Sequence, residues 1–91
     1  MLRLYIAGNS ASSQRARKNL AQLRKHMKAN EWKIEVIDVL LQPDIAEKAG
    51  ILATPTLSYD QPARPRRIIG DLSDTRRVLE FLGTEPSGDV T

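Results

Sequence analysis

The sequence contains no cysteine, and this absence excludes several kinds of site at once. Disulfide bonds, thiolate metal ligands and cysteine nucleophiles are ruled out across all 91 residues. Histidine occurs once, as His26, so a histidine-based zinc site or a Ser-His-Asp triad is not expected. We therefore predict a protein that is not an enzyme, with no catalytic residues, no metal ligands and no cofactor.

Long apolar runs are also missing. No stretch approaches the roughly 18 residues that span a membrane, and polar residues follow Ile6 too soon for a secretion signal. Hydrophobic residues make up 41% and charged residues 27% of the chain, an ordinary globular balance. We expect a cytoplasmic protein with one folded domain over residues 1–83 and a flexible polar tail over residues 84–91.

Negative charge is missing from the first third of the chain. Residues 1–30 hold seven Lys or Arg and no acid, whereas the other 61 residues hold seven Lys or Arg and eleven Asp or Glu. Such a basic region is typical of a solvated helix face, and it also suits contact with nucleic acid, a membrane surface or an acidic protein. Nucleic-acid binding is the less favoured of these, because no aromatic side chains are interleaved and no recognised motif is present.

The pattern of apolar residues predicts four strands and three helices. Alternating or β-rich segments predict strands over residues 2–7, 33–40, 56–59 and 66–69, the second of them buried on both faces. Apolar residues at helical spacing predict a first helix that starts among the hydroxyl residues 10–13 and ends near Asn30. Pro43 opens a second helix that ends at Gly50, and Ser73 caps a third whose apolar face is Val78, Phe81 and Leu82.

The order β-α-β-α-β-β-α around one sheet predicts an α/β protein with a thioredoxin-like single domain. Its first two strands should be parallel with a right-handed crossover, and the last two should form an antiparallel hairpin. Pro55 precedes the third strand, where this fold places a cis proline, so a cis Thr54–Pro55 bond is expected although most X-Pro bonds are trans.

Serine stands where redox enzymes of this fold carry their cysteine pair. Ser10 and Ser13 occupy both ends of the four-residue spacing, and a hydroxyl cannot perform thiol–disulfide exchange. Neither serine is a credible nucleophile, because His26 lies about 20 Å away near the other end of the same helix. Helix capping explains both serines, and Gly8-Asn9-Ser10 is only a weak match to a phosphate-binding loop.

Two segments of the chain resemble the KaiB family of small circadian-clock proteins. They are Ile51-Leu52-Ala53-Thr54-Pro55-Thr56-Leu57 and Arg66-Arg67-Ile68-Ile69-Gly70-Asp71-Leu72-Ser73, supported by residues 4–9 and 36–40. The resemblance covers about residues 2–82. It implies a non-catalytic regulator that binds the N-terminal ATPase ring of the hexameric ATPase KaiC, captures KaiA and displaces a sensor kinase.

The resemblance also implies that one sequence has two folds. One is thioredoxin-like and binds KaiC; the other rearranges residues 50–82 and assembles as a tetramer. The polar stretch over residues 58–65 holds two prolines, which favours a hairpin turn over a helix. We therefore predict the thioredoxin-like form as the resting fold and as a monomer, with the tetramer as the alternative.

Site residues follow from the resemblance by position. The expected partner contacts are all charged residues. They are Lys33, Glu35, Asp44, Glu47 and Lys48, with Arg15, Arg66 and Arg67 as weaker candidates. For each, the alternative is an ordinary solvated charge. Tyr5, Pro55, Gly70 and Asp71 are expected to act on the conformation.

The chain departs from the family pattern at the second strand. The family usually has a small residue and then a lysine two positions on, where this chain has Lys33 and Glu35. A reversed charge at an interface weakens binding to an unchanged partner. The second hypothesis is therefore a divergent KaiB-like adaptor in a non-clock signalling or stress pathway.

Overall fold

The computed structural model, which describes residues 1–25, 33–59 and 66–82, has the predicted order of elements. These elements are β1 (Leu2–Ile6), α1 (Ala11–Arg24), β2 (Ile34–Asp38), α2 (Pro43–Ala49), β3 (Thr56–Tyr59), β4 (Arg66–Ile69) and α3 (Thr75–Leu82). The bounds of β3 and β4 agree with the prediction residue for residue.

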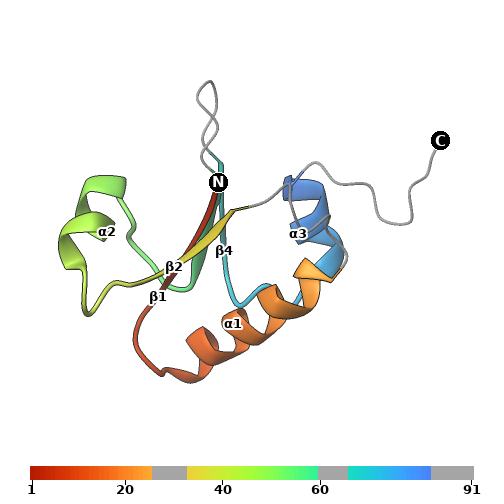
Figure 1. Cartoon of the computed structure of the whole chain (residues 1–91), viewed down its shortest axis with the longest axis horizontal. Coiled ribbons are helices and arrows are strands. Elements are labelled where there is room, and N and C mark those ends of the chain that lie inside the picture. The colour runs from red at the N-terminus through yellow and green to blue at the C-terminus, as the bar shows by residue number, and fades with distance from the viewer. Residues whose placement is uncertain (26–32, 60–65, 83–91) are drawn as a thin grey trace.

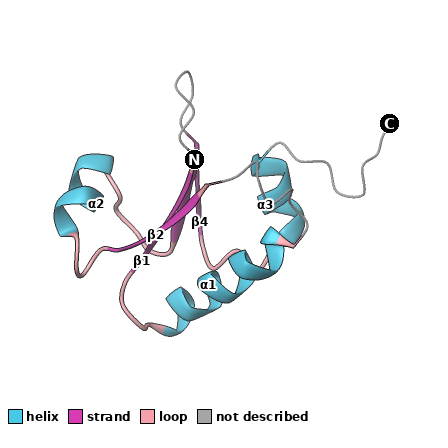
Figure 2. Ribbon diagram, in the orientation of Figure 1, coloured by secondary structure: helices cyan, strands magenta, loops and turns pink. Residues whose placement is uncertain are grey.

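The four strands form one mixed sheet in the order β2-β1-β3-β4 (Figure 2). β1 pairs in parallel with β2, and Leu4 lies opposite Val36. On its other side β1 pairs antiparallel with β3, which in turn pairs antiparallel with β4. The parallel pair and the antiparallel hairpin are thus both confirmed, and β2 and β4 form the two edges of the sheet.

Helices cover the two faces of the sheet unequally (Figure 1). α1 and α3 lie on one face, and α2 lies on the other. The larger core is formed by alternate residues of β1 with α1 and α3; it includes Leu2, Leu4, Ile6, Ala16, Leu20, Leu23, Leu57, Ile68, Leu72, Val78 and Leu79. The smaller core under α2 consists of Tyr5, Ile37 and Ala46 with partly buried neighbours. Because α2 is short, much of its face of the sheet stays open.

Local signals in the sequence account for most element ends. Ser10 caps α1, and its hydroxyl accepts a hydrogen bond from the Ser13 amide. Pro43 starts α2, and Gly50 ends it with a left-handed backbone at φ 71°. The Thr54–Pro55 bond is cis, as predicted.

The prediction that the second strand is buried on both faces is wrong. β2 is an edge strand, and Val36 is 42% exposed while Glu35 is also exposed. A run of apolar residues does not separate an edge strand from a central one, because only the order of strands in the sheet decides which neighbours cover it.

The prediction that Ser73 caps the last helix is also wrong. Asp74 holds that position, because its carboxylate accepts a hydrogen bond from the Arg77 amide at 3.2 Å. The Ser73 amide instead donates to the Asp71 carboxylate at 3.1 Å. The apolar face of α3 also includes Leu79, which the sequence reading did not name.

Several predictions lie outside the described residues. They concern the end of the first helix near Asn30, the residue His26, the part of the predicted hairpin turn over residues 60–65 and the tail over residues 84–91. Among the helices that the structure describes, none has the length and apolar character to cross a membrane.

We expect Leu57→Ala to lower the free energy of unfolding by about 2–5 kcal/mol, because it removes a fully buried side chain from the core. Ile69→Ala, in the neighbouring strand, should lower it by less than about 1 kcal/mol, since Ile69 is 64% exposed. Urea denaturation of the two variants measures both. Equal losses would contradict the assignment of the core.

Candidate docking surface

Exposed leucines and charges surround α2 at one end of the molecule. Leu40 and Leu41 lie in the loop before α2 and Leu52 in the loop after it, and these side chains are 68%, 79% and 99% exposed. We define the α2 surface by these leucines and the exposed charged residues of the helix; it comprises Leu40, Leu41, Asp44, Glu47, Lys48 and Leu52. Apolar side chains ringed by charges form the usual composition of a protein interface.

The loop that carries Leu40 and Leu41 is held by Asp38. One carboxylate oxygen of Asp38 accepts hydrogen bonds from the Gly8 amide at 3.0 Å and the Leu40 amide at 2.9 Å. Its backbone carbonyl accepts from the Leu41 and Gln42 amides at 3.0 and 2.9 Å. Asp38 therefore turns the chain from β2 into α2 and presents both leucines outward.

The C-terminal end of α2 is built as a Schellman motif. The Gly50 amide donates to the Glu47 carbonyl and the Ile51 amide to the Ala46 carbonyl, both at 3.0 Å. Ala46 and Ile51 also belong to the small core with Tyr5, so the two residues joined by a backbone hydrogen bond of the motif also take part in its apolar packing. A shallow cavity of about 250 Å³ between Val39, Ala46 and the loop over residues 51–54 adjoins Leu52.

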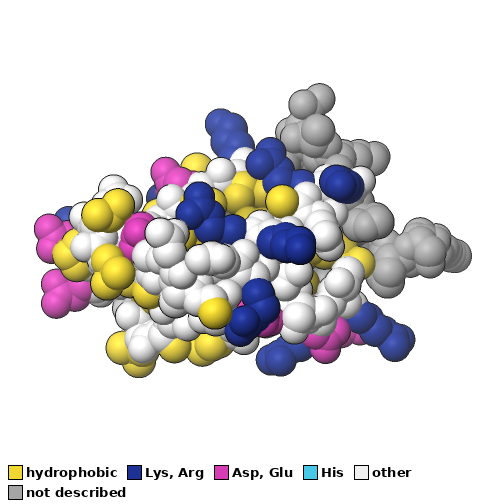
Figure 3. Space-filling view, turned by 90° about the horizontal axis from the view of Figure 1, so that it is seen from below, with side chains coloured by type: hydrophobic (Ala, Val, Ile, Leu, Met, Phe, Trp, Pro, Cys, Tyr) yellow, Lys and Arg dark blue, Asp and Glu magenta, His cyan; other side chains and the backbone are white. Residues whose placement is uncertain are grey.

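The predicted contacts Asp44, Glu47 and Lys48 are exposed and lie together on this surface. Figure 3 shows that acidic and hydrophobic side chains predominate at the end of the molecule where α2 lies, and that Lys and Arg side chains, with fewer acidic ones among them, predominate across the rest of that view. The basic side chains of α1 are exposed on the opposite layer; they include Arg15, Arg17, Lys18 and Arg24. The molecule is therefore electrostatically asymmetric.

The other predicted contacts lie elsewhere. Lys33 and Glu35 lie along the β2 edge, where the Glu35 carboxylate forms an ion pair with Arg3 at 3.1 Å. Arg66 donates to the Phe81 carbonyl at 3.0 Å, on the α3 side of the sheet. Arg67 donates to the Ala49 and Gly50 carbonyls, on the α2 side.

Arg15, predicted as a weaker contact, is paired with Asp71, predicted to act on the conformation. The Arg15 guanidinium donates to the Asp71 carboxylate at 2.9 Å, and the Asn19 amide group donates to the Asp71 carbonyl at 2.8 Å. These bonds join α1 to the loop between β4 and α3. The hydrogen bond from Arg15, and then those from Ser73, lower the pKa of Asp71 below its usual value.

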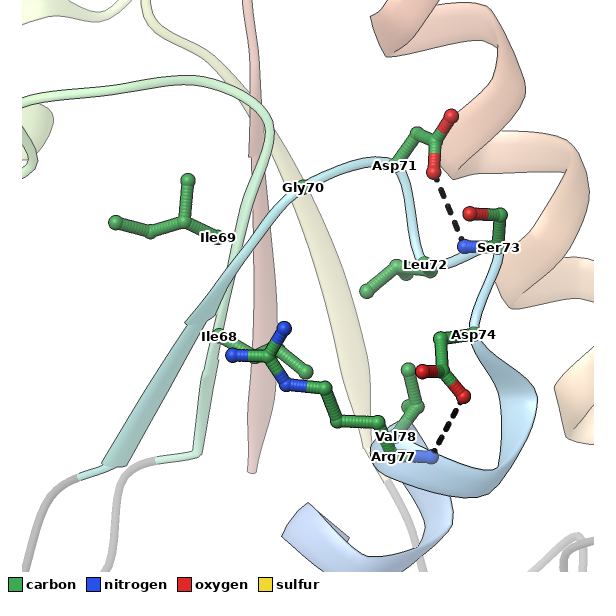
Figure 4. Close-up of a pocket in the computed structure, with 9 residues that line it drawn as sticks. All are labelled: Ile68, Ile69, Gly70, Asp71, Leu72, Ser73, Asp74, Arg77 and Val78. Atoms are coloured by element: carbon green, nitrogen blue, oxygen red, sulfur yellow. Dashed lines mark hydrogen bonds between the residues drawn. The ribbon is translucent and has the colours of Figure 1, made fainter.

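The loop between β4 and α3 has an unusual backbone (Figure 4). Gly70 has φ 131° and Leu72 has φ 64°, a left-handed value that is uncommon for leucine. The Gly70 amide donates to the Pro55 carbonyl at 3.0 Å. A small hollow of about 90 Å³ lies beside this loop. The carboxylates of Asp71 and Asp74, which line the hollow, each accept a hydrogen bond from a backbone amide.

The serines at the redox position form a closed local network. The Ser10 hydroxyl donates to the Ser13 hydroxyl at 2.8 Å, and the Ser13 hydroxyl accepts from the Ala7 amide at 3.0 Å. Ser13 is fully buried. Over residues 1–25, 33–59 and 66–82 no group of three or more His, Cys, Asp or Glu is placed to hold a metal ion.

Leu40, Leu41 and Leu52 were missed as site residues by the sequence reading. Their type predicts burial, so composition gives no signal that they are exposed. A weak signal exists at Leu41, which stands between the predicted strand and the helix-opening Gln42-Pro43, where a loop residue is expected.

A family model described as the KaiB domain matches residues 3–84. The circadian clock oscillator protein KaiB of Prochlorococcus marinus (strain MIT 9312) is 45% identical over an alignment 97 residues long. The alignment covers 98% of this chain and 92% of the relative. The KaiB protein of Synechococcus sp. (strain RCC307) is 51% identical over an alignment 92 residues long. This alignment covers 98% of this chain and 84% of the relative. The circadian clock protein KaiB3 of Synechocystis is 44% identical over 97% of this chain and 86% of its own length.

Solved structures confirm the predicted fold class. Mitochondrial thioredoxin 3 from Saccharomyces cerevisiae matches with a TM-score of 0.74 and 18% identity, over 90% of this chain and 74% of its own. The N-terminal domain of Synechococcus elongatus SasA matches with a TM-score of 0.69 and 22% identity, over 98% and 87%. At these identities the likeness concerns the thioredoxin-like fold alone.

We expect Asp71→Asn to lower the free energy of unfolding at neutral pH and to have little effect at acidic pH. The folded pKa of Asp71 lies below its ordinary value of 3.8, so its carboxylate stabilises the fold above that value. The contribution disappears as the pH falls through the lower folded pKa. Urea denaturation of wild type and variant, from neutral to strongly acidic pH, measures the difference.

Arg15→Gln provides the matched control, because it removes the other half of the ion pair. Its destabilisation should also fade as the pH falls but be smaller, because the Ser73 amide still donates to Asp71. The double variant should be little less stable than Asp71→Asn alone. A difference between wild type and Asp71→Asn that stays constant with pH would show that the charge of Asp71 is not what stabilises this loop.

Proposed function

This chain belongs to the KaiB family of circadian clock proteins, and we propose that it is a non-catalytic regulator that binds the N-terminal ATPase ring of a KaiC-like hexamer in its thioredoxin-like fold. Bound there, it changes which other clock proteins dock, among them KaiA and a sensor kinase. No cofactor takes part in this function.

One observation carries the proposal. A KaiB-family sequence adopts the thioredoxin-like fold, which the resemblance associates with KaiC binding, and exposes an apolar and charged surface around α2. The leucines supply the apolar area that anchors an interface, and Asp44, Glu47 and Lys48 supply charges at its rim. The absence of cysteine leaves this fold without the chemistry of thioredoxins.

The resting state of the chain is part of the proposal. We propose a monomer in the thioredoxin-like fold, which docks without a prior rearrangement. Mixing the protein with a KaiC hexamer and ATP and following co-elution by size exclusion tests this. Co-elution within minutes supports it, whereas co-elution only after hours, or a tetramer of the free protein, would favour the rearranged resting fold.

The divergent adaptor is the second candidate, and Glu35 favours it. Where the family usually has a lysine, this chain has a glutamate that forms an ion pair with Arg3 across neighbouring strands. The charge on this edge therefore differs from the family pattern. Recovery of another ATPase in pull-downs, together with no binding to any KaiC tested, would favour the adaptor.

We expect Lys48→Ala and Leu52→Ala each to weaken binding to KaiC by at least about fivefold, because one removes a charge and the other an exposed apolar side chain from the proposed interface. Lys18→Ala is the matched control, since Lys18 is an exposed lysine on α1, on the other side of the sheet. Titration of labelled protein with KaiC hexamers measures all three. A loss of equal size for Lys18→Ala would exclude the α2 surface as the specific contact.

A further inference from the structure

α2 depends on its surroundings for its position. It has seven residues, and isolated helices shorter than about 12 residues are marginal in water. Gln42, at its N-terminal end, makes no side-chain capping hydrogen bond. The apolar contacts of Ala46 with the core under α2 hold the helix on the sheet, but burial is non-directional and sets orientation only loosely.

Arg67 supplies directional contacts from β4. Arg67 lies opposite Ser58 and next to Ile68, whose side chain faces the other core. Because side chains alternate along a strand, that of Arg67 projects toward α2. The guanidinium donates to the Gly50 carbonyl at 3.3 Å and to the Ala49 carbonyl. One planar group thus binds the last two carbonyls at the end of the helix.

The Ala49 carbonyl is the last of the helix and is not used by the Schellman motif. The amides of Gly50 and Ile51 are used for the Glu47 and Ala46 carbonyls, and helix ends lack partners for their final carbonyls. A cation at this end is also favoured by the helix dipole. Arg67 therefore adds both hydrogen-bond donors and a positive charge at the C-terminal end of α2.

We propose that Arg67 is a positioning residue for docking: it orients α2, and with it the α2 surface, instead of contacting the partner itself. This inference rests on the proposed function, because it assigns the partner's contact to α2. It reverses the role that the sequence predicts for Arg67 as a contact residue.

The first test needs no partner. We expect Arg67→Ala to speed hydrogen exchange of the Gly50 and Ile51 amides at least about fivefold, while the amides of β1 keep their protection. Arg67→Lys should fall between, because an ammonium group does not reproduce the planar, forked donors of a guanidinium. Arg66→Ala is the matched control and should leave exchange in α2 unchanged, since Arg66 bonds to α3. Unchanged exchange in Arg67→Ala would overturn the proposal.

The second test separates positioning from direct contact. Arg67→Ala should weaken KaiC binding about fivefold or more, and adding Gln42→Ser should restore most of the loss, because a serine N-cap stabilises the same helix from its opposite end. A lost direct contact is not restored by a distant cap, so failure of the rescue, with α2 protection recovered, would overturn the proposal. If wild type does not bind KaiC, the proposed function fails, while hydrogen exchange still decides whether Arg67 positions α2.

Discussion

β1 is the element on which the rest of the structure depends. It is hydrogen-bonded to a strand on each side, and its alternating side chains enter both cores. Leu2, Leu4 and Ile6 pack under α1 and α3, and Tyr5 packs under α2. Because side chains alternate between the two faces of a strand, β1 alone contributes to both the larger core and the smaller core. A shift of its register by one residue would exchange the two faces and destroy both cores.

The sequence was sufficient for those features that depend on neighbouring residues. Pro43 and Gly50 delimit α2 because one lacks an amide that the first turn does not need and the other adopts a left-handed backbone. The hairpin of β3 and β4 followed from its short connection. The order of elements was predicted on the same basis, and the cis bond before Pro55 followed from the place of this proline in the thioredoxin-like fold, against the local preference for a trans bond.

Features that depend on residues distant in sequence were not predictable in this way. Apolar periodicity does not tell which strand lies at an edge, so Val36 was expected inside and lies partly exposed. Arg67 was predicted to be a weaker partner contact or an ordinary solvated charge, since no local pattern shows that it reaches Gly50 and Ala49, 17 and 18 residues away. The exposed leucines around α2 were not predicted as site residues, because leucine is usually buried and residue type alone does not show which leucines are exposed.

The hydrogen bonds that join the two halves of the chain bear directly on the choice between the two folds that the family resemblance implies. Arg15 and Asn19 bind Asp71, and Arg67 binds the end of α2. Arg15, Asn19 and Ala49 lie before the segment over residues 50–82, and their partners Asp71 and Arg67 lie within it. A fold that rearranged residues 50–82 would have to break these bonds and replace them, so they favour the thioredoxin-like form specifically. Secondary-structure preference acts in the same direction over residues 58–65, where two prolines oppose a helix. Local preference and contacts between distant residues therefore support the same fold, and the end of α2, where Arg67 acts, links this conformational preference to the surface proposed for docking.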